Sequence, residues 1–237
     1  MKISIALLAV TWIASAAEMP VAQQNALIQK YCAVCHTDAR PNGGLSLQHF
    51  DAAHADPADA AMVLSKVLGG ALGAAGLPAP DDATVDAWTS ALKAEAVGAD
   101  QWTLKRTANA VTASIVRAVP TAEQPDLYRL TLTCRNSREA EVQLAWAPGV
   151  PKSGQEFAVI PDKRVAKMYK VEGTETMGNG TSGTSGSGSI LLYKQSSVVQ
   201  IPADSLLIRD LFPQEKVSFP FAELTKENRV ALSACFL

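Results

Sequence analysis

Two cysteines and a histidine stand together near the start of the chain, at a spacing that suits covalent attachment of a haem. Residues 32–36 read Cys-Ala-Val-Cys-His, a C-x-x-C-H pattern. Two thiols so spaced can add to the haem vinyl groups as thioethers, and the adjacent histidine is then held against the iron as its proximal ligand. The pattern therefore predicts one covalent haem c, attached through Cys32 and Cys35, with His36 as the iron ligand.

Three other interpretations of these residues have less support. A thioredoxin-type C-x-x-C usually lies in a βαβ unit, and the flanking sequence does not predict one. A structural zinc site needs a second pair of ligands, and the remaining cysteines, Cys134 and Cys235, lie too far apart in sequence to supply a knuckle. A chance match to a five-residue pattern is the third, and the helix and export signal predicted before the motif argue against it.

The first 17 residues are typical of a secretory signal peptide. Lys2 provides the charged start, residues 3–13 are apolar, and Ala14-Ser15-Ala16 suits cleavage near Ala16 or Ala17. The apolar run is too short to span a bilayer, which takes roughly 20 residues. We therefore expect a periplasmic or secreted protein with no transmembrane segment, and a buried first helix is the alternative.

Short helices are expected to position the motif. Apolar residues at helical spacing in residues 26–31 predict a helix that leads into Cys32. Residues 60–70 predict an amphipathic helix with an apolar face, from which Ser65 and Lys66 point outward. Residues 81–96 predict a third helix, capped by Asp81 or Asp82. The apolar faces of the second and third helices consist of Met62, Leu64, Val67, Leu68, Val85, Trp88 and Leu92.

The segment YCAVCHTDARPNGGLSLQHFD, residues 31–51, resembles the opening of a small class I cytochrome c, in the variant that has a GGLSL segment after the motif. The stretch AGLPAPDDATVDAWTSALKAEA resembles the end of the same family. The resemblance covers residues 22–97 and implies a small all-α haem domain over residues 18–97. It also implies electron transfer with an as yet unidentified redox partner protein, and no enzymatic turnover.

The family's second axial ligand is usually a methionine in the loop before the last helix, and this loop here reads GGALGAAGLPAP. Alignment places Leu72 or Ala71 at the methionine position, and neither side chain can bind iron. One interpretation is an open iron site with an apolar distal pocket formed by Leu68, Leu72 and Leu77, which would bind NO, CO or peroxide. The alternatives recruit a ligand from elsewhere, and the candidates are Met62, His49, His54, Met168 and Met177.

The rest of the chain, residues 101–237, predicts an antiparallel, β-sandwich-like domain that ends in a short helix. Residues 102–108, 112–119, 128–135, 140–146, 157–162, 189–195 and 217–221 have β-rich or alternating character. The final helix is expected to be capped by Thr225 and to bury Leu224, Val230, Ala231 and Leu232. The overall fold class is therefore an all-α domain followed by an all-β domain.

Cys134 and Cys235 remain after haem attachment, and export favours a disulfide between them. Such a bond would close a loop of about 100 residues, worth on the order of 4 kcal/mol by chain entropy. Two buried free thiols are the alternative. The second domain contains no histidine, so no Ser-His-Asp site is expected in it, and its role would be docking.

Charge and composition exclude other classes of protein. The chain has 237 residues, a net charge of −2 and 6% aromatic residues. These values give no basis for nucleic-acid binding. Residues 18–99 carry an excess of five acidic side chains, whereas residues 100–237 carry an excess of two basic ones.

Overall fold

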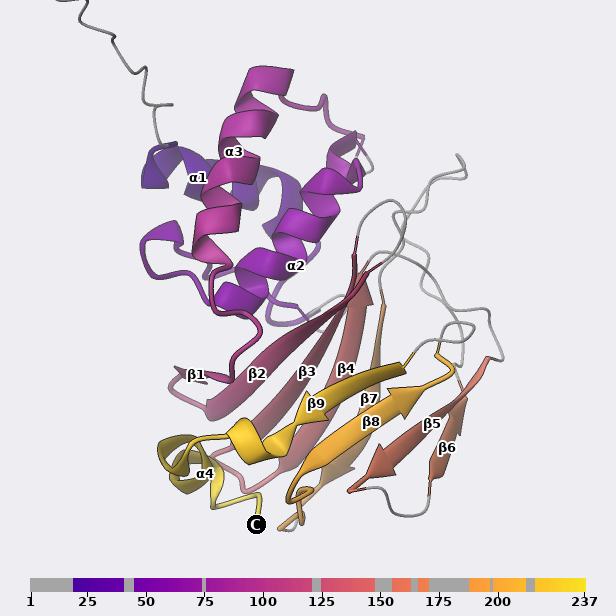
Figure 1. The fold of residues 1–237 in the computed structure, drawn as a ribbon. Coiled ribbons are helices and arrows are strands. Elements are labelled where there is room, and N and C mark those ends of the chain that lie inside the picture. The colour runs from indigo at the N-terminus through magenta and orange to yellow at the C-terminus, as the bar shows by residue number, and fades with distance from the viewer. Residues whose placement is uncertain are drawn as a thin grey trace, which may run out of the picture.

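The structure is a computed structural model that describes residues 19–40, 45–73, 76–120, 125–147, 155–162, 166–170, 188–196, 198–211 and 216–237. Within these ranges the chain forms a helical region followed by two antiparallel sheets (Figure 1). The predicted order of helices and then strands is confirmed. The predicted signal peptide and Met177 lie outside the described residues.

Three α-helices make up the helical region: α1 (Val21–Ile28), α2 (Pro57–Leu68) and α3 (Asp82–Glu95). A π-helical turn, Gln29–Ala33, continues α1 directly. Short 3-10 turns occur at Ala52–His54 and Ala71–Gly73.

The starts of α2 and α3 follow from their sequences. Asp56 caps α2 by accepting a hydrogen bond from the Ala58 amide, and Pro57 occupies the first helical position, where no amide donor is needed. Asp81 caps α3 through the Thr84 amide, at 2.8 Å, as one of the two predicted caps.

The first sheet has the order β1-β2-β3-β4-β7, and the second has the order β6-β5-β8-β9. All of the strand pairs are antiparallel. The sequence analysis missed β6 and β8. The strands are β1 (Thr103–Arg106), β2 (Ala110–Val119), β3 (Asp126–Arg135), β4 (Ala140–Ala147), β5 (Glu156–Pro161), β6 (Lys167–Lys170), β7 (Gly188–Gln195), β8 (Ser205–Arg209) and β9 (Lys216–Pro220).

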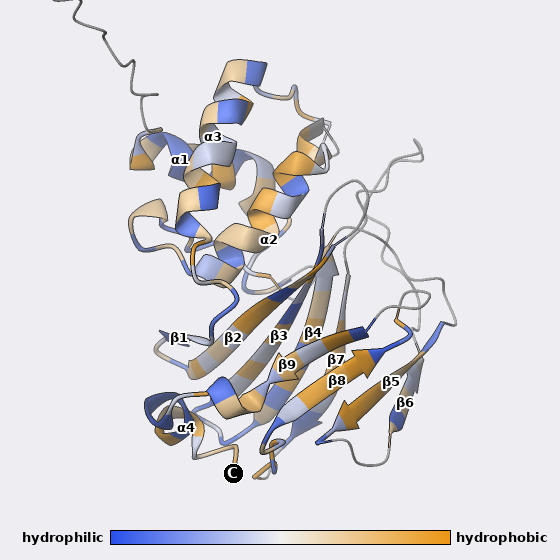
Figure 2. Ribbon diagram, viewed as in Figure 1, coloured by the Kyte–Doolittle hydropathy of each residue, from blue (hydrophilic) through white to orange (hydrophobic). Residues whose placement is uncertain are grey.

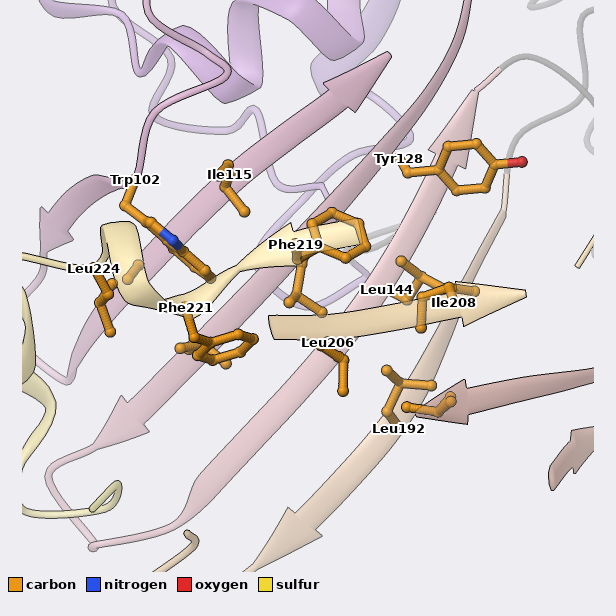
Figure 3. Packing of buried hydrophobic residues seen from close by; sticks show 14 of the residues in the cluster. Trp102, Ile115, Tyr128, Leu144, Leu192, Leu206, Ile208, Phe219, Phe221 and Leu224 are labelled. Atoms are coloured by element: carbon orange, nitrogen blue, oxygen red, sulfur yellow. The ribbon is translucent and has the colours of Figure 1, made fainter. Parts of the chain in front are cut away.

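The two sheets pack face to face around one apolar core (Figure 3). Ile115, Leu130 and Leu144 from the first sheet are fully buried, as are Phe157 and Phe219 from the second. Hydrophobic and hydrophilic residues intermingle along the strands (Figure 2), as expected where one face of a sheet packs inward. The architecture is therefore a sandwich whose first sheet also has an outer face.

That outer face contacts helix α2, which is packed on two sides (Figure 1). Two residues predicted to face outward are covered as a result: Ser65 is buried, and burial lowers the pKa of Lys66 to about 8. Leu68, predicted to line the distal pocket, is instead 52% exposed. A one-sided amphipathic pattern cannot predict a helix held between a helical core and a sheet.

The end of the chain returns to the first sheet. Helix α4 (Lys226–Leu232) follows the 3-10 turn Phe221–Glu223, and its cap is Thr225, as predicted. Leu232 is fully buried, but Val230 is 65% exposed, so its predicted inward position is wrong. The helix has only about two turns, which leaves room for one narrow buried stripe.

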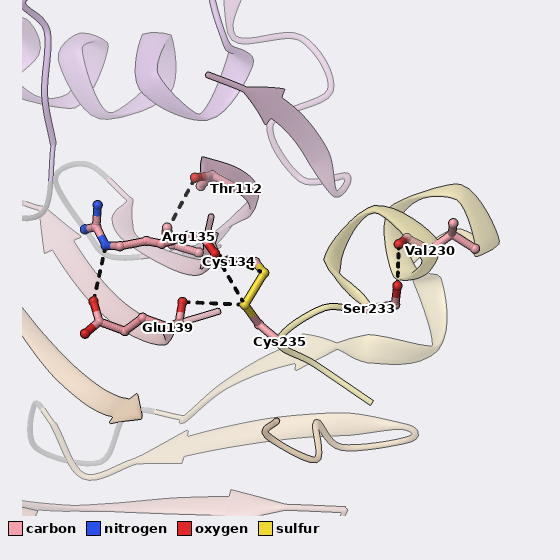
Figure 4. The surroundings of a disulfide bond; sticks show 8 residues. Thr112, Cys134, Arg135, Glu139, Val230, Ser233 and Cys235 are labelled. Atoms are coloured by element: carbon pink, nitrogen blue, oxygen red, sulfur yellow. Dashed lines mark hydrogen bonds and ion pairs between the residues drawn. A yellow bond between two sulfur atoms is a disulfide. The ribbon is translucent and has the colours of Figure 1, made fainter. Parts of the chain in front are cut away.

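A disulfide joins Cys134, near the end of strand β3, to Cys235, beyond α4 (Figure 4). The two Cα atoms are 5.5 Å apart. Beside it, the Val199 amide donates to the Cys235 carbonyl at 2.7 Å and the Leu237 amide donates to the Val199 carbonyl at 2.9 Å. The disulfide and this short parallel pairing hold the chain end on the sandwich.

Candidate functional site

The Cys-Ala-Val-Cys-His segment lies where the first helix ends. Cys32 belongs to the π-helical turn that extends α1, and the amides of Cys35 and His36 both donate to its carbonyl, at 3.1 Å each. These bonds close a tight turn, so the two thiols and the imidazole come from about one turn of chain. Single π-helical turns occur frequently at functional sites.

The His36 ring is oriented by the backbone. Its Nδ1 lies 3.1 Å from the Leu45 carbonyl oxygen, and the Leu47 amide donates to the His36 carbonyl at 2.7 Å. A carbonyl can only accept, so this contact requires the proton on Nδ1 and makes Nε2 the basic nitrogen. The sequence analysis noted the GGLSL segment but did not predict that Leu45 would orient the histidine.

The thiols of Cys32 and Cys35 are both half-buried. Burial, and to a smaller degree the neighbouring Cys35, raises the pKa of Cys32 to about 12. A thiol-disulfide oxidoreductase needs a lowered cysteine pKa. The surroundings of Cys32 therefore do not favour the oxidoreductase alternative.

The loop between α2 and α3 folds back over this segment. The Tyr31 hydroxyl donates to the Pro78 carbonyl at 2.8 Å, which joins the residue before Cys32 to that loop. Leu72 is buried in the same hydrophobic cluster that Cys32 borders, and Leu77, next to Pro78, is half-buried. The structure thus places Leu72 in the buried cluster that Cys32 borders.

Two of the alternative ligands are exposed histidines. His49 Nε2 lies 3.1 Å from Asp38 Oδ2, and 72% of the His49 side chain is exposed. His54 pairs with Asp51 at 3.0 Å and is 84% exposed, and this hydrogen bond is the main reason why the pKa of Asp51 is lowered. Both histidines are thus engaged with carboxylates at the surface.

The methionine candidates lie elsewhere. Met62 is three residues after Asp59 and four after Ala58, so it shares the stripe of α2 that faces the first sheet. The buried cluster that contains Met62 also contains Ala145 and Ala147 of β4. Met168 is 57% exposed on β6, the edge strand of the second sheet (Figure 1). These positions suit packing for Met62 and a surface location for Met168.

Four buried polar atoms in the described part of the helical region have no hydrogen-bond partner: the indole Nε1 of Trp88, the hydroxyl of Ser65, Gln24 Oε1 and Glu95 Oε2. Trp88 is completely buried in the cluster that Cys32 borders. A buried N–H without an acceptor is costly, and such groups in native proteins usually have a partner. A group with carboxylates, as haem has in its propionates, could supply an acceptor here, so the residues fit this cofactor. Sequence patterning gave no signal for this role of Trp88.

No cluster of three or more histidine, cysteine, aspartate or glutamate side chains could hold a metal ion in the described ranges. Among the same residues, no helix has the length and hydropathy needed to cross a membrane.

Comparison with known proteins gave no match: no family model, curated protein sequence or solved structure is significantly similar to the chain.

Proposed function

We propose that the chain is an exported c-type cytochrome, in which the helical region is a class I cytochrome c domain carrying one covalent haem. Cys32 and Cys35 form the thioether links, and His36 is the proximal iron ligand. The bound haem supplies a one-electron iron couple. The chain transfers electrons and catalyses no turnover of its own.

The observation that carries this proposal is the contact between His36 Nδ1 and the Leu45 carbonyl, at 3.1 Å. Histidines that bind metals usually donate their other ring N–H to a carbonyl or carboxylate, which fixes both the tautomer and the ring orientation. In this chain the contact lies directly beside the two thiols, so the motif is already arranged for ligation through Nε2. A chance C-x-x-C-H sequence would not require this arrangement.

The remaining residues shape the pocket. Leu72 and Leu77 contribute apolar surface on the distal side and exclude water from it. Tyr31 fixes the loop that carries them, through Pro78. The indole of Trp88 offers a buried donor to a carboxylate of the group. A small helical domain gains stability from the apolar surface of such a group.

We assign the sandwich a docking role, in which it presents the cytochrome domain to a redox partner protein. The helical region carries the acidic excess, and its exposed carboxylates favour a partner with a basic surface.

Burial of Leu72 favours a second candidate function, reversible binding of a small ligand at an open iron site. Leu72 stands at the position that the resemblance aligns with the methionine, it is buried, and its hydrocarbon side chain cannot donate to iron. A distal pocket without a ligand permits binding of NO, CO or peroxide. The sandwich would then report the bound state.

One experiment tests electron transfer through a covalent haem and distinguishes it from reversible ligand binding. The full chain is produced in a periplasm that has a haem c maturation system, beside a Cys32→Ala/Cys35→Ala variant and a matched control, His54→Ala, at an exposed histidine. The wild type and the control should be coloured and show a reversible one-electron wave, and the double variant should be colourless. A coloured double variant would contradict covalent attachment.

The ferric spectrum and CO then distinguish the candidates. Low-spin iron that is indifferent to CO supports electron transfer with an internal sixth ligand. High-spin iron that binds CO rapidly after reduction supports ligand binding.

A further inference from the structure

Helix α2 belongs to two packed surfaces at once. Val63 and Val67 are buried in the cluster that contains Leu45 and Leu72 and borders Cys32. On another face of the helix, Ala58 and Ala61 are buried against residues of the linker and the first sheet, Ala99, Val116 and Leu127. One rigid element therefore contacts both the proposed haem pocket and the sandwich.

A buried ion pair fixes this second contact. Asp59 Oδ1 of α2 lies 2.6 Å from Arg129 Nη1 of β3, and less than a tenth of either side chain is exposed. Arg129 Nη2 also donates to the Ser114 hydroxyl of β2, at 3.2 Å. Lys105 of β1 approaches Asp59 Oδ2 at 3.4 Å. The carboxylate of one helix thus engages cations from two strands.

Such a pair specifies geometry more than it adds stability. Two charges removed from water lose hydration that their attraction only partly restores, but loss of one partner leaves the other charge buried and uncompensated. Sliding or rotation of α2 on the sheet would separate Asp59 from Arg129. Ala58 and Ala61, on the same helix as Asp59, pack closely against the linker and the first sheet.

We infer that α2 couples the haem site to the sandwich through Asp59 and Arg129, so that haem attachment orders β3 and its neighbours. This inference rests on the proposed function for its haem. Haem attachment restrains Val63 and Val67, which holds α2, and the ion pair extends the restraint to the first sheet. Coupling of this kind is reciprocal, so packing of α2 on the sandwich also favours the position of α2 that haem attachment stabilises.

Amide hydrogen exchange on the full chain tests the coupling. The exchange of Leu130 and Leu132 in β3 is compared between the haem-loaded wild type and the Cys32→Ala/Cys35→Ala chain. Haem attachment should slow this exchange on the order of tenfold. In the Asp59→Asn background, the ratio of the exchange rates without and with haem should be close to one, and the absorption spectrum should be unchanged. The matched control is Glu223→Gln, which removes a carboxylate from an exposed pair with Arg117 of β2, and it should keep the wild-type ratio.

If Asp59→Asn fails to fold, a Asp59→Leu/Arg129→Met double variant replaces both charges with apolar side chains, and it should fold and lose the ratio. A folded variant without the ion pair that keeps the wild-type exchange ratio would overturn the assignment of the coupling to Asp59 and Arg129. An equally large loss of the ratio in Glu223→Gln would overturn it as well. Covalent haem is measured by mass on every sample. Haem present with no change in β3 exchange would overturn the coupling alone, whereas a wild type without haem would overturn both proposals.

Discussion

Removal of the disulfide should destabilise the sandwich by a calculable amount. Cys134 and Cys235 are 101 residues apart in sequence. In the chain-entropy model, a cross-link that closes a loop of this length lowers the entropy of the unfolded chain enough to stabilise the fold by about 4.7 kcal/mol at 25 °C. A Cys134→Ala/Cys235→Ala variant should therefore lose about 4 to 5 kcal/mol of unfolding free energy.

The structure gives two reasons why the loss should not be smaller. Both cysteines are buried, at 5% and 0% exposure, so alanines leave a small cavity in the core. The pairing of Val199 with the chain end, next to Cys235, would also lose its anchor. Reduction of the wild type should cause the chain-entropy part of this loss, because it opens the same loop without leaving a cavity.

Urea unfolding at 25 °C, followed by circular dichroism, measures the effect. Ser233→Ala is the matched control because it removes only a local hydrogen bond to the Val230 carbonyl, on an exposed side chain two residues before Cys235. Ser233→Ala should lower the free energy of unfolding by less than about 1 kcal/mol. A disulfide variant that loses no more than this control would refute the loop-closure reasoning.

Three further predictions concern the helical region. Burial raises the pKa of Glu95 in the folded chain from 4.5 to about 7, so the folded state favours the neutral acid. The free energy of unfolding should therefore fall as the pH rises from about 4.5 to about 7, and then level off. Urea titrations at several pH values measure this slope, which should be absent in Glu95→Gln. Tyr31→Phe removes the hydrogen bond to the Pro78 carbonyl and should lower the free energy of unfolding by about 1 kcal/mol in urea titrations, with faster amide exchange in the loop between α2 and α3. Unchanged exchange in this loop would argue that Tyr31 does not hold it. Met62→Leu should leave the ferric absorption spectrum unchanged and cost less than about 1.5 kcal/mol, whereas a change of spin state would identify Met62 as an iron ligand.

The parts of the fold that were predictable are those determined by local chemistry. Alternation along residues 128–135 and 140–146 marks strands β3 and β4 because a half-buried sheet needs one apolar face. Asp81 and Thr225 were predicted as caps because a short polar side chain can satisfy the first amides of a helix.

What could not be predicted depends on contacts between distant segments. Asp59 reads as a solvated residue near the start of α2, and only the approach of β3 makes it half of a buried pair. Leu68 belongs to a predicted apolar stripe, yet 52% of it is exposed in the folded chain. Strand β6 has only four residues, Lys167–Lys170, with two lysines, which gives little alternation to detect.

The candidate site divides in the same way. The motif of Cys32, Cys35 and His36 is a local signal, so it was found from the sequence. The Leu45 carbonyl that orients His36, and the buried indole of Trp88, require the tertiary fold. A backbone acceptor has no signature in residue type, and a core tryptophan has the same sequence pattern with or without a partner for its N–H.

The most direct test of the whole account is the mass of the peptide that contains residues 32–36, taken from protein matured in a periplasm with haem c machinery and washed with acid–acetone. Covalent attachment predicts an addition of about 616 Da on this peptide, with colour retained in the protein. A peptide of unmodified mass, with all colour extracted into the acetone, would contradict it.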